Sequence, residues 1–450
     1  MMAPTNQRLG FHYFADTNHY REIDLQAWLP ELHRLGAAWL TLIAPAGWAV
    51  PEYFITGLLA DGLQPILHFP LTLEETPDYQ GIGLMLRNYA RWGVRYAAFY
   101  DRPNRQNAWL ASGWAQTDLV ERFLDAYLPL AQTALEQGIV PLLPPLEPGG
   151  DYWDLAFLQL TLRGLHRRNL QPLLDELVMG AYAWAGNRPL GWGEGGPGRW
   201  PGVRPYQDAP GMQNQQGFRI FDWYLAIAEQ ELGRTLPIVL LRAGVCPGDQ
   251  TDPGLPVIDE AAHAQGSLAI ARCLAAEADL PDCQEPVPGE VLACNLWLLA
   301  DEPDGPHARQ AWFQVGGRTL PAVDALRRWA GETGWANGQM GKRSAPAGGP
   351  AHRAENSSQA EGADLQRPIS HYVLLPLYAW GAAEWSLDLI APLLQTSRAT
   401  VGFSSEEARM AERVTVVGGD MAISEVVVAE LRQAGCVVDR ILEDGTVVAP

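Results

Sequence analysis

The feature that most constrains the fold is an alternation of short apolar segments with longer segments of helical spacing. Eight apolar segments have the length of buried strands, and each is followed by a helical pattern. Eight such repeats predict an α/β fold of the (β/α)8 TIM-barrel type. An open, doubly wound sheet is the alternative, but no Gly-rich phosphate loop follows the first strand. The predicted strands span residues 10–14, 39–43, 64–69, 96–100, 139–143, 177–184, 237–241 and 291–298.

The sequence divides into three regions, of which the predicted barrel is the first, at residues 1–336. Residues 337–368 are rich in Gly, Ala, Ser, Pro and Gln, and too few are apolar to form a core, so a disordered linker is expected. Residues 369–450 alternate again between strand and helix patterns, including a helix over 385–394. They predict a small three-layer α/β domain of flavodoxin-like type.

Composition excludes several classes of partner. The net charge of −20 over 450 residues argues against nucleic acid and anionic membrane surfaces, which need a basic face. No apolar run is long enough to span a bilayer. The first strand begins near residue 10 with no charged-then-apolar leader before it, so a cytoplasmic location is the default expectation, although leaderless export remains compatible with the sequence.

Neither a cofactor nor a metal is predicted. The five cysteines show no CxxC spacing and are expected to be buried free thiols. His12 and His68 fall in the first and third predicted strands without the His-x-His spacing of barrel metal sites. They are therefore interpreted as core or hydrogen-bonded histidines.

The most informative stretch is YAAFYDRPNRQNAW, residues 96–109. A buried strand ends there at Asp101, and Arg102, Pro103 and Asn104 follow. Pro103 favours an extended conformation for Arg102. Barrels of this type keep their chemistry at the carboxyl ends of the strands, so this cluster is a candidate site.

This sequence motif resembles that of retaining glycoside hydrolases of the large (β/α)8-barrel clan. Their fourth strand ends in Asn-Glu-Pro, and some branches add an Asn and, a few residues on, a Trp. Pro103, Asn104 and Trp109 fit that pattern, whereas Asp101 replaces the Asn and Arg102 replaces the acid/base Glu. At the seventh strand, LPIVLLRAG places Arg242 where the family has its nucleophilic Glu. The resemblance covers about residues 9–329.

The resemblance implies a sugar-binding barrel, and the two arginines imply that hydrolysis is lost. Retaining hydrolysis needs two carboxyl groups about 5 Å apart. A guanidinium group can neither donate the proton nor attack the anomeric carbon. The predicted function is therefore non-catalytic binding of a carbohydrate in an aromatic cleft, with an acidic or cell-wall glycan favoured by the arginines. The predicted ligand-binding residues are Arg102, Asn104, Trp109, Tyr182, Trp184, Arg242 and Trp297.

Two alternatives stay open. The first is a divergent glycoside hydrolase that uses Asp101 and Glu147, or another loop carboxylate such as Glu194, as its catalytic groups. If these two residues are not catalytic, we expect Asp101 to form a salt bridge and Glu147 to be a solvated charge in its loop. In the second alternative, both arginines pair with neighbouring acids and close the cleft, which leaves a scaffold.

Overall fold

The computed structural model of the chain consists of two compact units, a barrel and a smaller α/β unit. Its described residues are 7–73, 75–205, 211–277, 285–335, 369–376, 389–390, 393, 399–419, 422–442 and 446–448. The predicted linker at residues 337–368 and most of the predicted helix at 385–394 lie outside them.

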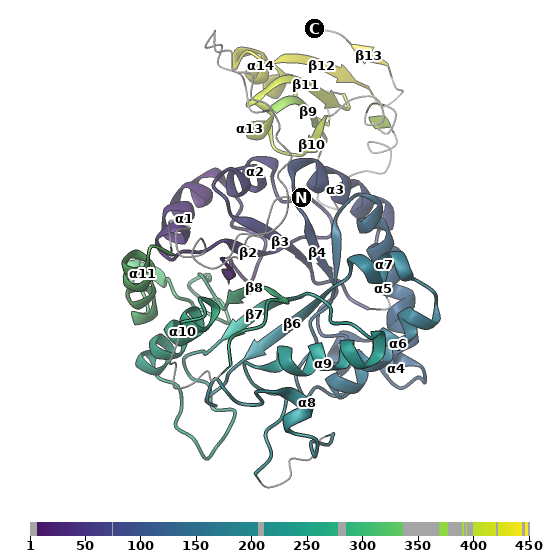
Figure 1. The fold of residues 1–450 in the computed structure, drawn as a ribbon. Helices are drawn as coiled ribbons and strands as arrows, with labels where there is room; N and C mark the ends of the chain where they lie inside the picture. Colours follow the sequence, from purple (N-terminus) through teal and green to yellow (C-terminus); the bar gives the residue numbers. More distant parts are fainter. Residues whose placement is uncertain are drawn as a thin grey trace, which may run out of the picture. The chain divides into compact units, whose positions relative to one another are not determined.

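Eight parallel strands form a closed barrel in sequence order, which confirms the predicted fold. The ring closes where β1 pairs with β8, with Gly10 opposite Asn295. Figure 1 shows the strands at the centre with the helices around them. The strands are β1 (Leu9–His12), β2 (Trp39–Ile43), β3 (Gln64–Phe69), β4 (Tyr96–Phe99), β5 (Val140–Leu143), β6 (Val178–Trp184), β7 (Ile238–Gly244) and β8 (Val291–Leu296).

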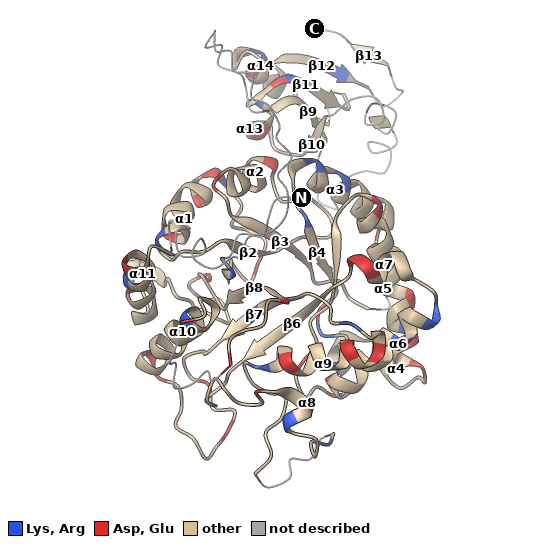
Figure 2. Cartoon of the chain, viewed as in Figure 1, with Lys and Arg blue, Asp and Glu red and all other residues tan. Residues whose placement is uncertain are grey.

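Amphipathic helices cover the outside of the barrel. Acidic and basic residues are interspersed along them, in keeping with their solvent-facing sides (Figure 2). The longer helices are α1 (Glu22–Arg34), α2 (Glu52–Ala60), α3 (Tyr79–Trp92), α5 (Leu119–Glu136), α6 (Asp154–Arg167), α9 (Ile220–Leu232), α10 (Glu260–Leu274) and α11 (Pro321–Thr333). Shorter ones are α4 (Ala111–Trp114), α7 (Gln171–Glu176), α8 (Gly196–Arg199) and the 3-10 turns η1 (Gln106–Ala108) and η2 (Val315–Gly317).

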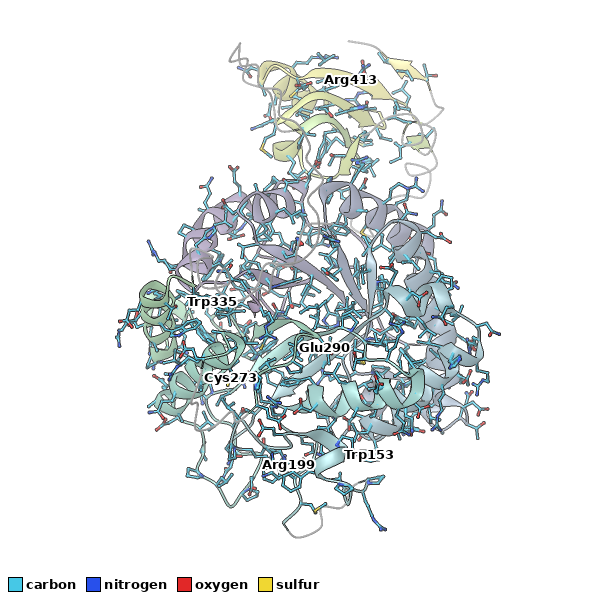
Figure 3. The ribbon with its side chains drawn as sticks, viewed as in Figure 1. Trp153, Arg199, Cys273, Glu290, Trp335 and Arg413 are labelled. Atoms are coloured by element: carbon cyan, nitrogen blue, oxygen red, sulfur yellow. The ribbon has the colours of Figure 1, made fainter. Side chains whose placement is uncertain are left out.

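The end of the barrel unit is tied to its beginning. Trp335 follows α11, and its indole Nε1 donates to the carbonyl oxygen of Gly36 over 3.0 Å (Trp335 is labelled in Figure 3). Gly36 has φ +69°, and a Cβ added there would meet Trp335 Cδ1 at 2.5 Å. Glycine is therefore required both by the left-handed turn and by the indole.

The barrel interior changes from apolar to polar toward the carboxyl ends of the strands. One apolar cluster takes residues from β2 to β8, among them Trp39, Ile66 and Ala293. Side chains two positions further along a strand face the same interior, because strand residues alternate. Those positions hold Thr41, His68 and Asn295, and His12 lies opposite Thr41 in the register. These four buried residues, His12, Thr41, His68 and Asn295, are called the polar layer below.

The smaller unit contains a five-stranded sheet of order β10-β9-β11-β12-β13. Its first four strands are parallel and β13 is antiparallel, so the sheet is mixed, and the flavodoxin-like type stays a prediction. Helices α13 (Ser405–Ala408) and α14 (Glu425–Gln433) contribute to the apolar cluster on one side, and residues 389–390 belong to a second cluster. The strands are β9 (Ile369–Leu374), β10 (Thr400–Gly402), β11 (Ala411–Val417), β12 (Val437–Ile441) and β13 (Val447–Val448). The last was not predicted, and it pairs antiparallel with β12.

The cysteines and the hydrophobicity of the helices can be compared with the sequence predictions. Four of the five cysteines lie in it, and each is a buried free thiol as predicted: Cys246, Cys273, Cys294 and Cys436. Cys283 lies outside the described residues. Among the described helices, none has the combination of length and apolarity needed to cross a bilayer.

Candidate functional site

The backbone at the exit of β4 is strained. Tyr100 has φ +69° and Arg102 has φ +45°, so two of the five non-glycine residues described with positive φ flank Asp101. The expectation that Pro103 makes Arg102 extended is therefore wrong. The turn brings the Arg102 amide to the carbonyl oxygen of Pro145 over 3.0 Å, and that tie to the loop after β5 overrides the local preference. Strain of this kind is concentrated at functional sites.

The Arg102 guanidinium lies between two carboxylates. Its Nε and Nη2 each lie 3.1 Å from Asp101 Oδ2, and its Nη1 lies 3.1 Å from Glu147 Oε2. Glu147 is also within 3.7 Å of Arg105 Nη1. Asp101 thus forms the salt bridge that was the structural alternative for it, whereas Glu147 is an ion-pair partner rather than a solvated loop charge. The guanidinium therefore bridges the two acids, and its single positive charge balances one of their two negative charges.

Asp101 is held in its ionised form. Its burial alone would raise the carboxyl pKa, but the charges of Arg242, His68 and Arg102 and the hydrogen bond from Tyr182 outweigh burial, so the pKa lies below its ordinary value. The Tyr182 hydroxyl donates to Asp101 Oδ1 over 2.6 Å. A general acid at neutral pH needs a raised pKa, which is the opposite shift.

Arg242 projects from β7 at the same end of the barrel, with different neighbours. Its guanidinium carbon lies 4.9 Å from the ring centre of Tyr182 and 4.5 Å from that of Trp297. Among the described residues no carboxylate lies within 4.0 Å of it, and its buried Nε has no hydrogen-bond partner there. β7 continues past the predicted end at residue 241 to Gly244, so Arg242 belongs to the strand itself.

Three of the predicted aromatic residues form a cluster at Arg242, in which Tyr182 and Trp297 contact the guanidinium and Trp184 contacts those two rings. The ring centre of Trp184 lies 6.0 Å from that of Tyr182 and 6.0 Å from that of Trp297. Tyr182 and Trp297 are buried, with 1% and 4% of their surface exposed, whereas Trp184 is only partly buried. Trp184 therefore offers the accessible ring, and the other two hold the guanidinium in place.

The polar layer lies next to this cluster. The rings of His12 and Trp297 are in edge contact at 4.7 Å between centres. Burial, followed by the charges of Arg242, His68 and His307, holds the pKa of His12 well below its ordinary value. Both ring nitrogens of His12 lack a hydrogen-bond partner among the described residues, and so does Nδ1 of His68. The sequence interpretation of His12 and His68 as core histidines agrees with their burial, and the alternation of strand residues could have predicted that they face inward. Nothing in the sequence indicates that they lie near Arg242.

Asn104 and Trp109 are placed beneath the surface, where they position other residues. The Asn104 amide donates to the carbonyl oxygens of Glu147 and Tyr152 over 2.8 and 3.0 Å and accepts from the Glu147 amide over 2.8 Å. Trp109 Nε1 donates to the carbonyl oxygen of Pro103 over 2.7 Å. Asn104 joins the loops after β4 and β5, and Trp109 binds within the loop after β4, so a direct contact with ligand is assigned to neither.

Two other carboxylates, the candidate Glu194 and Asp154, are buried and bind loop residues. Glu194 is buried, accepts from the Glu285 amide over 2.8 Å and lies 3.8 Å from Arg219. Asp154 is fully buried, and burial raises its pKa to about 6 in spite of hydrogen bonds from Gly149 and Gln215. Among the described residues, no hydrogen bond or ion pair joins either carboxylate to Arg242 or its aromatic neighbours.

One group of potential metal ligands exists among the described residues. Asp16, His19 and Glu302 offer ligand atoms within 4.8 Å of one another. However, His19 Nδ1 lies 2.9 Å from Asp16 and Nε2 lies 3.2 Å from Glu302, so both ring nitrogens already face carboxylates. This arrangement is that of a histidine held by two acids, and a metal site is not assigned.

Comparisons with known proteins find likeness in structure alone. No protein-family model and no curated protein matches the sequence. A family 39 glycoside hydrolase from Bacteroides cellulosilyticus WH2 is 10% identical with a TM-score of 0.45, over 72% of this chain and 64% of that one. A family 128 endo-β-1,3-glucanase from Sorangium cellulosum is 12% identical with a TM-score of 0.40, over 71% of this chain and 97% of that one.

Other similar structures include a further glycosidase and an aldolase. A fungal β-1,4-galactanase is 12% identical with a TM-score of 0.42, over 72% of this chain and 99% of that one. A fructose-bisphosphate aldolase from Plasmodium falciparum also matches, with 11% identity and a TM-score of 0.36 over 76% of this chain and 94% of that one. At TM-scores below 0.5 these likenesses carry no argument about the chemistry of this chain.

Proposed function

We propose that this barrel binds a carbohydrate at the carboxyl end of its strands without hydrolysing it. The observation that carries the proposal is the position of Arg102, whose guanidinium separates Asp101 from Glu147. The sequence resemblance to sugar-cleaving barrels suggests that the ligand is a carbohydrate. The arginines at both expected catalytic positions suggest that hydrolysis is lost. The replacement of the two glutamates by arginine remains part of this proposal.

The electrostatics of Asp101 argue against the alternative of a divergent hydrolase. Both carboxylates of the candidate pair are bound to the same cation, and the pKa of Asp101 is lowered. Glycoside hydrolysis requires one carboxyl that is protonated and a second that faces the sugar without an intervening cation. The pKa shift of Asp101 is opposite to that of a proton donor, and the Arg102 cation stands between Asp101 and Glu147.

Sugar contact is assigned to the residues of the cluster that remain accessible. Trp184 presents an aromatic ring on which the apolar face of a sugar ring can stack. Arg102 and Arg242 offer donors to ring hydroxyl oxygens. Tyr182 and Trp297 take part indirectly, because they hold Arg242 between β6 and β8.

The test is isothermal titration of the full chain with neutral and acidic oligosaccharides, combined with an assay for new reducing ends. Saturable binding without release of reducing ends is expected. Trp184→Ala should weaken binding about tenfold through loss of stacking. Trp28→Ala, which removes a partly buried ring from the outer helix α1, should leave affinity unchanged. Absence of binding to every sugar would contradict the proposal.

A further inference from the structure

We infer that Arg242 is the receptor for an oxyanion on the ligand, a carboxylate or a sulfate group carried by a sugar ring. This inference rests on the proposed carbohydrate function and specifies the chemistry of the ligand. It assigns the anion to one of the two arginines and excludes the other.

The arginines differ in how their charges are balanced. Arg102 is bound by Asp101 and Glu147, and Arg105 lies within 3.8 Å of Asp151 as well as near Glu147. Arg242 has no carboxylate within ion-pair distance in the described chain. A guanidinium is charged at every working pH, and a partly buried charge is costly unless it is paired. The binding free energy of an anion should therefore be more favourable at Arg242 than at Arg102.

Asp101 is an acid that acts on Arg242, since the charge of Arg242 helps to lower the pKa of Asp101, but it forms no ion pair with Arg242 because both of its oxygens are already engaged. Oδ1 accepts from Tyr182, and Oδ2 accepts from Arg102. The net charge of −20 opposes an anion only weakly, since charges beyond about 8–10 Å are screened at physiological salt. Whether an anion binds therefore depends on the charges close to Arg242 rather than on the net charge of the chain.

The rings around Arg242 leave its hydrogen bonds open. Tyr182 and Trp297 stabilise the cation through their π-systems, and neither contact is a hydrogen bond to a side-chain oxygen. The N–H groups lie in the guanidinium plane, and the buried Nε–H has no acceptor there. A carboxylate can accept two parallel hydrogen bonds from the edge of a guanidinium, which a sugar hydroxyl cannot do.

The polar layer is the second, independent observation. Both nitrogens of His12, Nδ1 of His68, Oγ1 of Thr41 and Oδ1 of Asn295 are buried without a hydrogen-bond partner among the described residues. Four strands contribute these atoms to one end of the barrel interior. Buried polar groups in native proteins nearly always have partners, so this concentration beside Trp297 points to a polar group that enters from the ligand side.

The experiment is titration of the full chain with matched tetrasaccharides: β-1,3- and β-1,4-linked gluco, manno and galacto series, each with its C6-carboxylate and its 6-O-sulfate. In at least one series the acidic member should bind at least about tenfold tighter than the neutral one. Arg242→Gln should abolish that difference. The control Arg327→Gln, an arginine 5.6 Å from the Phe313 ring on the outer helix α11, should preserve it.

A measurement on the unaltered protein covers the case in which Arg242→Gln does not fold. Raising NaCl from about 50 to about 500 mM should weaken binding of the acidic member and leave the neutral one unchanged. Equal affinity for both members at low salt would overturn the inference and leave the proposed function standing. Binding of no member would overturn both. The carboxylate and sulfate arms show which anion is preferred.

Discussion

At the residue scale, identical side chains have different functions because their neighbours differ. Arg102 holds two loops together through Asp101 and Glu147, and Arg242 rests on two aromatic rings without a carboxylate. The sequence pattern treated the two arginines as equivalent, since both follow an apolar strand. Their pairing depends on side chains from neighbouring strands, which a single sequence does not define.

His12 provides a test of the polar layer. His12→Phe should keep the edge contact with Trp297 and change the free energy of unfolding at pH 7.5 by less than about 1 kcal/mol, because no hydrogen bond to a described residue is lost. The folded pKa of His12 is depressed, so below about pH 6.5 only the unfolded chain binds its proton, and stability falls as pH falls.

The Phe variant should lack this loss. Relative to the wild type, it should gain about 1.4 kcal/mol per pH unit below about pH 6.5, until the folded pKa is reached. Urea unfolding at pH 7.5 and 5.5 measures both quantities. An unchanged pH dependence in the variant would mean that His12 titrates normally in the folded protein.

Asn104 provides a test of loop positioning. Asn104→Ala removes three hydrogen bonds between the loops after β4 and β5, so the free energy of unfolding should fall by about 2–4 kcal/mol. The neighbouring Asn107 is exposed, and Asn107→Ala should cost less than about 0.5 kcal/mol. Equal effects in chemical denaturation would show that the Asn104 bridge contributes no stability.

At the element scale, most of the barrel could be predicted from periodicity, and the exceptions have physical causes. β7 is longer than expected because a charged residue, Arg242, ended the predicted apolar run. β13 is a two-residue strand whose existence depends on pairing with β12, and so has no local signal. Arg102 follows a contact with Pro145 rather than the preference set by its following proline. Tertiary contacts decide each of these cases.

The closure between α11 and the turn after α1 can be tested with a matched pair of glycines. Gly36→Ala should destabilise by about 2–3 kcal/mol, because it adds a Cβ against Trp335 to the cost of a positive φ. Gly62→Ala also has positive φ, with no atom within 4 Å of the new Cβ, and should cost only about 1 kcal/mol. Thermal melts compare the two, and equal losses would exclude a contribution from the Trp335 contact.

At the scale of the whole molecule, the chain joins a closed barrel to a smaller unit with its own core. Barrels with this strand order support many reactions, so the fold does not define the function. The proposed function concerns one end of the barrel, where Arg102 bridges two carboxylates and Arg242 lies against two aromatic rings. We propose that this end binds a sugar without cleaving it.

The most direct test is turnover of a panel of aryl glycosides by the full chain, measured beside Asp101→Asn and Glu147→Gln. All three proteins are expected to release the aryl group at the rate of the buffer blank between pH 4 and 8. Turnover by the unaltered protein that disappears in Asp101→Asn or Glu147→Gln would contradict binding without catalysis.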